Sequence, residues 1–120
     1  MADKDIRGRA GELRAARYLT AQGFTLLDRN WRCADGEIDI VAARGEELVV
    51  VEVKTRRTDR YGHPFEAVDA RKRKRLWRLA GAWVLAHPEL ARGHRVRLDV
   101  VGVTGEAPAT AVVEHLVDVR

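Results

Sequence analysis

Residues 36–57 constrain the fold more than any other part of the chain, because they combine long apolar runs with isolated ionisable side chains. The segment GEIDIVAARGEELVVVEVKTRR indicates two β-strands joined by the polar turn Arg44-Gly45-Glu46-Glu47. Three ionisable residues, Asp39, Glu52 and Lys54, interrupt the apolar runs. Ionisable groups are costly to bury in a strand otherwise made of Val, Ile and Leu, so these three indicate a function.

The turn also predicts how the two strands are paired. A four-residue turn would place Ala43 opposite Leu48, and the same register then places Asp39 opposite Glu52. Lys54 shares a face with Glu52, because side chains alternate between the faces of a strand with a period of two. The hairpin therefore predicts two carboxylates and one ammonium group close together, an arrangement that suits a metal site better than a core.

The remaining segments predict an α/β fold with a central mixed β-sheet flanked by helices, in one domain over residues 1–120. We expect helices over residues 6–22 and from Pro64 to about His87, and strands over residues 24–31 and 95–103. Residues 58–63 are polar and contain a glycine, so they are expected to form a loop. Residues 110–119 fit either a weak terminal strand or a short helix.

Glu12 lies on or next to the buried face of the first predicted helix, which Ala15, Ala16 and Leu19 define. One interpretation is a glutamate at the edge of the core that extends to water. The other is a third carboxylate directed at the site of Asp39 and Glu52. The helix alone leaves both interpretations open.

The charge of the chain is unevenly distributed. The net charge is +4, but residues 54–78 contain ten basic and three acidic residues and so carry +7. A basic zone beside an acidic cluster suggests a polyanionic substrate that is drawn to a metal-dependent site.

The single Cys33 excludes an internal disulfide and a cysteine-based zinc site. The N-terminus has no apolar run typical of a signal peptide, and no run is long enough for a membrane span, so we expect a cytoplasmic protein.

Phosphodiester hydrolysis gives these residues a chemical role. Carboxylates that hold Mg²⁺ or Mn²⁺ can activate water and neutralise charge at phosphorus, while a lysine orients the attacking water. Asp39, Glu52 and the backbone carbonyl of Val53 would form the metal shell. Lys54 would be the water-orienting residue.

An Asp on one strand followed by Glu-x-Lys on the next resembles the PD-(D/E)XK nuclease superfamily, with Asp39 and Glu52-Val53-Lys54 at its core positions. Nearly the whole chain is similar to one bacterial family of that superfamily, the YraN-type proteins. The matching blocks are Gly11-Glu12-x-x-Ala15-x-x-Tyr18-Leu19-x-x-x-Gly23-Phe24, Gly36-Glu37-Ile38-Asp39-Ile40-Val41, Val51-Glu52-Val53-Lys54-Thr55-Arg56, Tyr61-Gly62, Ala67-Val68 with Lys72 and Leu76, and Leu98-Asp99-Val100-Val101. One departure is Ile38, which stands where the name of the superfamily motif has proline.

The resemblance implies a restriction-endonuclease-like fold, closest to archaeal Holliday-junction resolvases, in which a glutamate of the first helix joins the metal cluster. Glu12 matches that glutamate, so the resemblance favours its functional interpretation. The implied activity is a divalent-metal-dependent endonuclease that acts on DNA, including branched intermediates of recombination and repair. Cutting both arms of a branched substrate would require two sites, and we therefore expect a homodimer.

Several basic residues are candidates for contacts with the nucleic-acid backbone, although such runs can also form a solvated helix face. They are Arg56, Arg57, Arg71, Lys72, Lys74, Arg75 and Arg78. Lys72 falls within the apolar stripe of its helix, so we expect its stem to follow the core and its ammonium group to reach the rim of the site.

Two other functions fit the sequence less well. A non-catalytic nucleic-acid-binding module would keep the fold and use the basic helix. A partner-binding protein would use the same helix as a contact surface. Neither function needs Asp39, Glu52 and Lys54 to remain together. An inactive domain could instead pair Asp39 with Lys54, but such buried pairs add little net stability.

Overall fold

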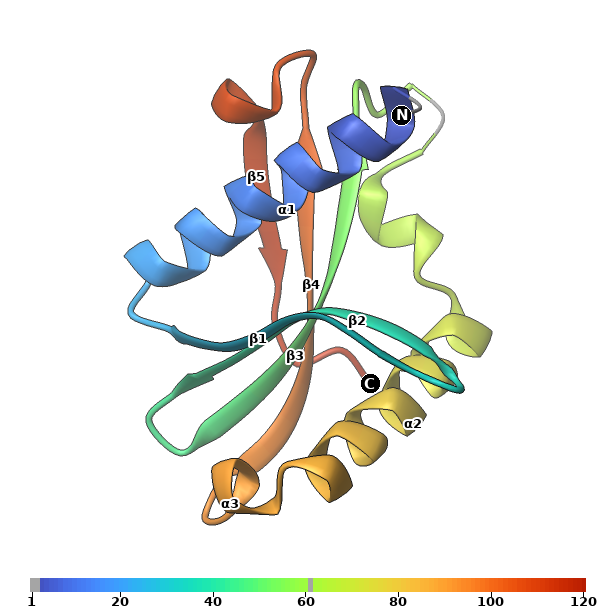
Figure 1. The fold of residues 1–120 in the computed structure, drawn as a ribbon. Coiled ribbons are helices and arrows are strands. Elements are labelled where there is room, and N and C mark those ends of the chain that lie inside the picture. Colours follow the sequence, from blue (N-terminus) through green and yellow to red (C-terminus); the bar gives the residue numbers. More distant parts are fainter. Residues whose placement is uncertain (1–2, 61) are drawn as a thin grey trace.

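The computed structural model describes residues 3–60 and 62–120, with side chains from residue 6 onward, and shows a five-stranded sheet flanked by helices (Figure 1). The predicted α/β fold with a central mixed sheet is confirmed, and it agrees with a restriction-endonuclease-like architecture. Tyr61, one of the residues behind the family resemblance, lies outside the described residues. The elements in chain order are α1 (Asp3–Ala21), β1 (Thr25–Cys33), β2 (Gly36–Arg44), β3 (Glu47–Arg56), the 3₁₀ helix η1 (Pro64–Ala67), α2 (Ala70–Ala86), α3 (Pro88–Ala91), β4 (Arg95–Thr104), the 3₁₀ helix η2 (Pro108–Thr110) and β5 (Val112–Leu116).

The strands lie in the order β1-β2-β3-β4-β5. β1, β2 and β3 form an antiparallel meander, whereas β3 and β4 are parallel and are connected through α2. The parallel pair runs from Glu47↔Arg95 to Arg56↔Thr104, and β5 completes the sheet antiparallel to β4. Among the described residues, none of the helices has both the length and the apolar character that crossing a bilayer demands.

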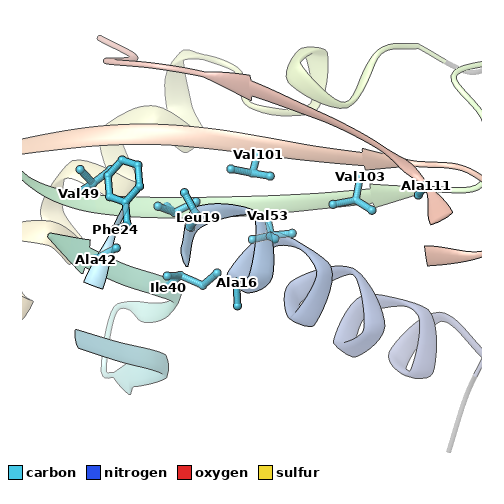
Figure 2. Close-up of a cluster of buried hydrophobic side chains, with 12 residues drawn as sticks. Ala16, Leu19, Phe24, Ile40, Ala42, Val49, Val53, Val101, Val103 and Ala111 are labelled. Atoms are coloured by element: carbon cyan, nitrogen blue, oxygen red, sulfur yellow. The ribbon is translucent and has the colours of Figure 1, made fainter. Parts of the chain in front are cut away.

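The central strand β3 is buried on both faces, which explains its nearly continuous apolar sequence. Val49, Val51 and Val53 pack under α1, in a cluster that Figure 2 shows together with Leu19 and Phe24. The alternate residues of β3 pack under α2. That second cluster contains Leu48, Val50, Leu76, Leu79, Ala80, Trp83 and Leu98.

Strand β2 leaves β3 halfway along its length. Its pairing with β3 runs from Arg44↔Glu47 to Ile40↔Val51, whereas its pairing with β1 continues to Gly36. Ile40 belongs to the cluster under α1 but Ile38 belongs to the cluster under α2, although the two are only two positions apart and would share a face in a regular strand. The chain therefore turns at Asp39, and the β1–β2 hairpin bends across the sheet (Figure 1).

The prediction of one helix from Pro64 to about His87 is wrong in one respect, because this segment is interrupted near its start. The segment from Pro64 forms η1, and α2 starts only at Ala70. Asp69 causes the break, since its carboxylate accepts a hydrogen bond from the backbone N–H of Lys72 at 2.9 Å and caps the new helix. Val68, which precedes the break, is nevertheless buried in the cluster under α2.

Two smaller expectations were also corrected or decided. The hairpin turn contains two residues instead of four, because Arg44 and Glu47 pair with each other. The predicted pair Ala43↔Leu48 is confirmed, but the pairing ends at Ile40↔Val51, one step before the predicted pair of Asp39 and Glu52. Residues 110–119 contain the terminal strand β5, not a helix.

A buried carboxylate attaches β5 to the rest of the sheet. Asp99 is fully buried and accepts hydrogen bonds from the Arg97 guanidinium at 2.9 Å and from the Asp118 backbone N–H at 2.9 Å. His115 Nε2 lies 2.7 Å from the same carboxylate, and its Nδ1 lies 3.0 Å from the Tyr18 hydroxyl of α1. Burial opposes ionisation of Asp99, but the bonds to His115 and Arg97 outweigh it and lower its pKa.

Two glycines of α1 should respond in opposite ways to the same substitution. A Cβ on Gly11 would lie 2.0 Å from Thr55 Oγ1 of β3, whereas a Cβ on Gly8 would meet nothing within 4 Å. Gly11→Ala is expected to lower the free energy of unfolding by about 1–3 kcal/mol. Gly8→Ala is expected to raise it by about 0.5–1 kcal/mol, since alanine stabilises a helix interior. Urea denaturation followed by circular dichroism measures both, and a shift of the same sign in both variants would contradict the close approach of α1 to β3.

Candidate active site

Asp39 lies at the point where β2 leaves β3, and its side chain replaces a backbone interaction of the sheet. The last paired residues of the two strands are Ile40 and Val51. Beyond them, Asp39 Oδ2 accepts a hydrogen bond from the backbone N–H of Val53 at 2.8 Å. The register predicted from the hairpin therefore places Asp39 next to Glu52, but the separation of the strands opens the space between β2 and β3.

Glu52 is the most enclosed member of the site, with 7% of its surface exposed. Lys54 Nζ lies 3.4 Å from Glu52 Oε2, which agrees with their predicted position on one face of β3. Lys72 of α2 approaches the same oxygen at 3.0 Å. The expectation that Lys72 reaches the rim of the site is confirmed, and its ammonium group contacts a carboxylate predicted to bind metal.

The two carboxyl groups have opposite pKa shifts. Burial and the neighbouring charge of Glu52 raise the pKa of Asp39 to about 8, although the hydrogen bond from Val53 opposes the change. Burial would also raise the pKa of Glu52, but the charges of Lys54 and Lys72 lower it. The two shifts therefore favour a neutral Asp39 beside an ionised Glu52.

The two lysines also differ. Burial and the nearby ammonium group of Lys72 lower the pKa of Lys54. Burial acts against the charge of Lys72 too, but its contacts with Lys54 and Glu52 outweigh this effect and raise its pKa. Lys54 is thus the lysine that releases its proton more readily, which suits a residue that contacts an attacking water.

A pocket of about 290 Å³ brings the predicted metal ligands together with the start of α1. Asp39, Glu52, Val53 and Lys54 line it, together with Arg7, Gly8, Glu12, Thr55 and Arg56. We name it the active-site pocket. It contains every residue that the sequence proposed for catalysis or metal binding.

Glu12 lines the active-site pocket, but its hydrogen-bond partner is Asn30 of β1. Its Oε1 accepts a hydrogen bond from the Asn30 side-chain amide at 2.5 Å, and its charge contributes to the raised pKa of Asp39. Within residues 6–60 and 62–120, no three side chains of His, Cys, Asp or Glu form a group able to hold a metal ion. Asp39 and Glu52 therefore meet as predicted, while Glu12 lies at their border.

The donors of the pocket fit a hard divalent cation. Asp39 and Glu52 supply carboxylate oxygens, which Mg²⁺ and Mn²⁺ prefer. The N–H of Val53 points toward Asp39, and the carbonyl of a strand residue points to the same side as its N–H, so this oxygen faces the space that β2 vacates. The raised pKa of Asp39, caused by burial and the charge of Glu52, agrees with a site that favours added positive charge.

The predicted nucleic-acid contacts divide into two groups. Four of them line a pocket of about 310 Å³ along α2, which also contains Ala67 and Asp69: Arg71, Lys72, Arg75 and Arg78. Arg56 lines the active-site pocket. Arg57 and Lys74 are exposed and line neither pocket. Lys72 connects the two groups, since it lines the α2 pocket and contacts Glu52.

Sequence reasoning missed a cleft next to the active-site pocket, although it had already singled out one residue of that cleft, Glu12. Gly8, Arg9, Glu12, Arg29, Asn30, Arg32 and Glu37 line a larger cleft of about 650 Å³ between α1 and the β1–β2 hairpin. These residues come from segments about twenty positions apart and follow no periodic pattern. The one local signal is Asn30, whose φ of +52° is a conformation that asparagine tolerates better than most residues.

The raised pKa of Asp39 predicts a stability that decreases with pH. The unfolded chain releases this proton near pH 3.8 and the folded chain near pH 8, so the stabilisation is complete below about pH 3.8 and is lost as the pH rises to about 8. Asp39→Asn keeps an oxygen for Val53 and carries no charge. In EDTA at pH 8, the variant should exceed the natural protein in free energy of unfolding by at least about 1.4 kcal/mol, the equivalent of one pKa unit. Near pH 4 the two proteins should be equally stable, and a constant difference across this range would contradict the protonated Asp39.

Comparison of the sequence with known proteins identifies its family. The model of "Uncharacterised protein family UPF0102" matches residues 11–103, which include Glu12, Asp39, Glu52 and Lys54. A UPF0102 protein of Paenarthrobacter aurescens (strain TC1) is 53% identical over 97% of this chain and 94% of its own length. One of Arthrobacter sp. (strain FB24) is 54% identical over 97% of both chains. The chain therefore belongs to the UPF0102 family, as its resemblance to the YraN-type proteins predicted.

Proposed function

We propose that the protein is a divalent-metal-dependent endonuclease that hydrolyses phosphodiester bonds in DNA. The observation that carries the proposal is the meeting of Asp39, Glu52 and Lys54 where β2 separates from β3. The sheet does not need these charges for its packing. A protonated Asp39 beside an ionised Glu52 is instead typical of a site that exchanges protons or binds a cation.

Each residue has a role in this reaction. Asp39, Glu52 and the Val53 carbonyl would hold the cation, with Glu12 at the border of the pocket. A bound Mg²⁺ or Mn²⁺ supplies Lewis-acid chemistry at the phosphoryl group and at water. Lys54 contacts the attacking water through its ammonium group and can take part in its proton transfer. Lys72 keeps Glu52 ionised, so that this carboxylate remains able to accept a cation.

The basic face of α2 supports a polyanionic substrate. Arg71, Arg75 and Arg78 line one pocket with Lys72, whose ammonium group also contacts Glu52. A backbone bound to these guanidinium groups would therefore lie next to the catalytic carboxylates. Branched DNA is the proposed substrate on the basis of the resemblance to Holliday-junction resolvases, and a homodimer would present two such sites.

A non-catalytic nucleic-acid-binding module remains the second candidate, and one observation favours it. Glu12 is hydrogen-bonded to Asn30, and two lysines already contact Glu52, so the described site has internal partners for its charges. This candidate predicts salt-sensitive binding that neither EDTA nor Asp39→Asn alters.

Cleavage of labelled DNA distinguishes the two candidates. The natural protein should cut a labelled four-way junction, or single-stranded DNA, in Mg²⁺ or Mn²⁺ and not in EDTA. Asp39→Asn and Lys54→Met should each lower the rate by about 10²-fold or more, because each removes a group that acts on the reacting atoms. Gel electrophoresis of the products gives the rates.

Two controls accompany this assay. Glu89→Gln removes an exposed carboxylate from α3, away from the active-site pocket, and should leave the rate unchanged. Mn²⁺ should raise the melting temperature of the natural protein but not that of Asp39→Asn. A folded natural protein that cuts neither DNA nor RNA in either metal would overturn the proposed nuclease.

A further inference from the structure

We propose that the cleft between α1 and the β1–β2 hairpin is a second nucleic-acid-binding surface, which holds a stretch of phosphodiester backbone that the face of α2 does not reach. We name it the arginine cleft; its residues are Gly8, Arg9, Glu12, Arg29, Asn30, Arg32 and Glu37. The inference rests on the proposed function, because it assumes that the anion entering the active-site pocket is a nucleic acid.

The arginine cleft is continuous with the active-site pocket. Gly8 and Glu12 line both spaces, so the two meet along one turn of α1. The cleft has a volume of about 650 Å³ against about 290 Å³ for the active-site pocket. A polymer held at Asp39 would therefore extend into the cleft, whereas the basic residues of α2 lie in a separate pocket.

The carboxylates of the cleft already have partners. The Asn30 amide donates to Glu12 Oε1 at 2.5 Å and lies 3.3 Å from Glu37 Oε1, so it bridges α1 and β2. Arg32 Nε pairs with Glu37 Oε2 at 2.8 Å. Glu12 and Glu37 therefore have partners within the protein. They compete little with a phosphate for the other arginines of the cleft.

Two arginines of the cleft are available to bind a ligand. Among the described residues, the guanidinium groups of Arg9 and Arg29 have no carboxylate partner, and both side chains are exposed. They come from α1 and β1, on the two walls of the cleft. Guanidinium groups bind phosphate oxygens through two parallel hydrogen bonds, and a phosphodiester between the walls would satisfy both arginines.

The second feature of the cleft is Gly8, which leaves open space where the cleft joins the active-site pocket. A glycine inside a helix costs stability, and a Cβ at this position would meet no atom of the protein within 4 Å. Its packing in the folded chain therefore does not require glycine, in contrast to Gly11, which β3 approaches closely. Gly8 lies where the two spaces join, and a side chain there would project into the path of a bound strand.

Removal of the two arginines tests the charge of the cleft. Binding of a fluorescein-labelled four-way DNA junction is measured by anisotropy in EDTA over a series of salt concentrations. Arg9→Ala/Arg29→Ala should weaken binding and reduce the slope of log K against log salt by about 2, because each neutralised phosphate contributes about 0.9. Arg92→Ala/Arg120→Ala removes the same charge outside the cleft and should keep the natural slope. Equal slopes for both double variants, or no binding by the natural protein, would overturn the proposal.

A pair of helix glycines tests the shape of the cleft without changing its charge. Gly8→Gln and Gly81→Gln both place a good helix former where a Cβ meets open space, so both should keep or raise the melting temperature. Only Gly8→Gln should weaken binding of the junction, by several-fold. Natural affinity in Gly8→Gln would overturn the proposal.

The two proposals fail in different ways. Binding that depends on Arg9, Arg29 and Gly8, in a protein that cuts no substrate in Mg²⁺ or Mn²⁺, would support the arginine cleft and reject the nuclease. If the protein cleaves DNA with a metal, but substitution of Arg9, Arg29 and Gly8 leaves binding of the junction unchanged, the nuclease would be supported and the arginine cleft rejected.

Discussion

The hydrogen bond from the Val53 backbone to the Asp39 carboxylate is the interaction on which the candidate active site depends. It satisfies a backbone donor that would otherwise lose its partner where β2 leaves β3. The hairpin can therefore bend away without leaving this N–H unpaired, and the edge of β3 becomes the floor of the active-site pocket. The same carboxylate is held in place by the main chain, which fixes its position beside Glu52.

Charge balance then connects this edge to both helices. Glu52 receives one ammonium group from its own strand and one from α2, while α1 contributes Glu12 from the other side. A buried pair of this kind contributes little to stability compared with apolar packing of the same volume. Its effect here is on the pKa values, which separate a protonated Asp39 from an ionised Glu52. The surrounding sheet supplies the stability, through Val and Leu side chains on both faces of β3.

The sequence was most informative where short-range rules decide the structure. Two-residue periodicity and a tight turn were sufficient to bring Asp39, Glu52 and Lys54 together, because the register of a hairpin depends on residues close in sequence. The interruption before α2 could not be predicted, because the whole segment from Pro64 onward is compatible with a helix and Asp69 starts a new one within it. The arginine cleft could not be predicted, because it depends on how far the β1–β2 hairpin bends across the sheet. With that bend, Ile38 packs under α2, and no local pattern specifies this packing.

The parallel pairing of β3 with β4 also bears on the order in which the chain folds. Glu47 pairs with Arg95, 48 positions away, whereas β1, β2 and β3 pair through tight turns. Closing the longer loop costs more entropy, so we expect the three-stranded meander to form before α2 and β4 dock. Asp39 and Glu52 would then meet before Lys72 reaches them, and protonation would relieve their repulsion in the intermediate stage. Docking of α2 is then the step that completes the site, because it brings Lys72 to Glu52.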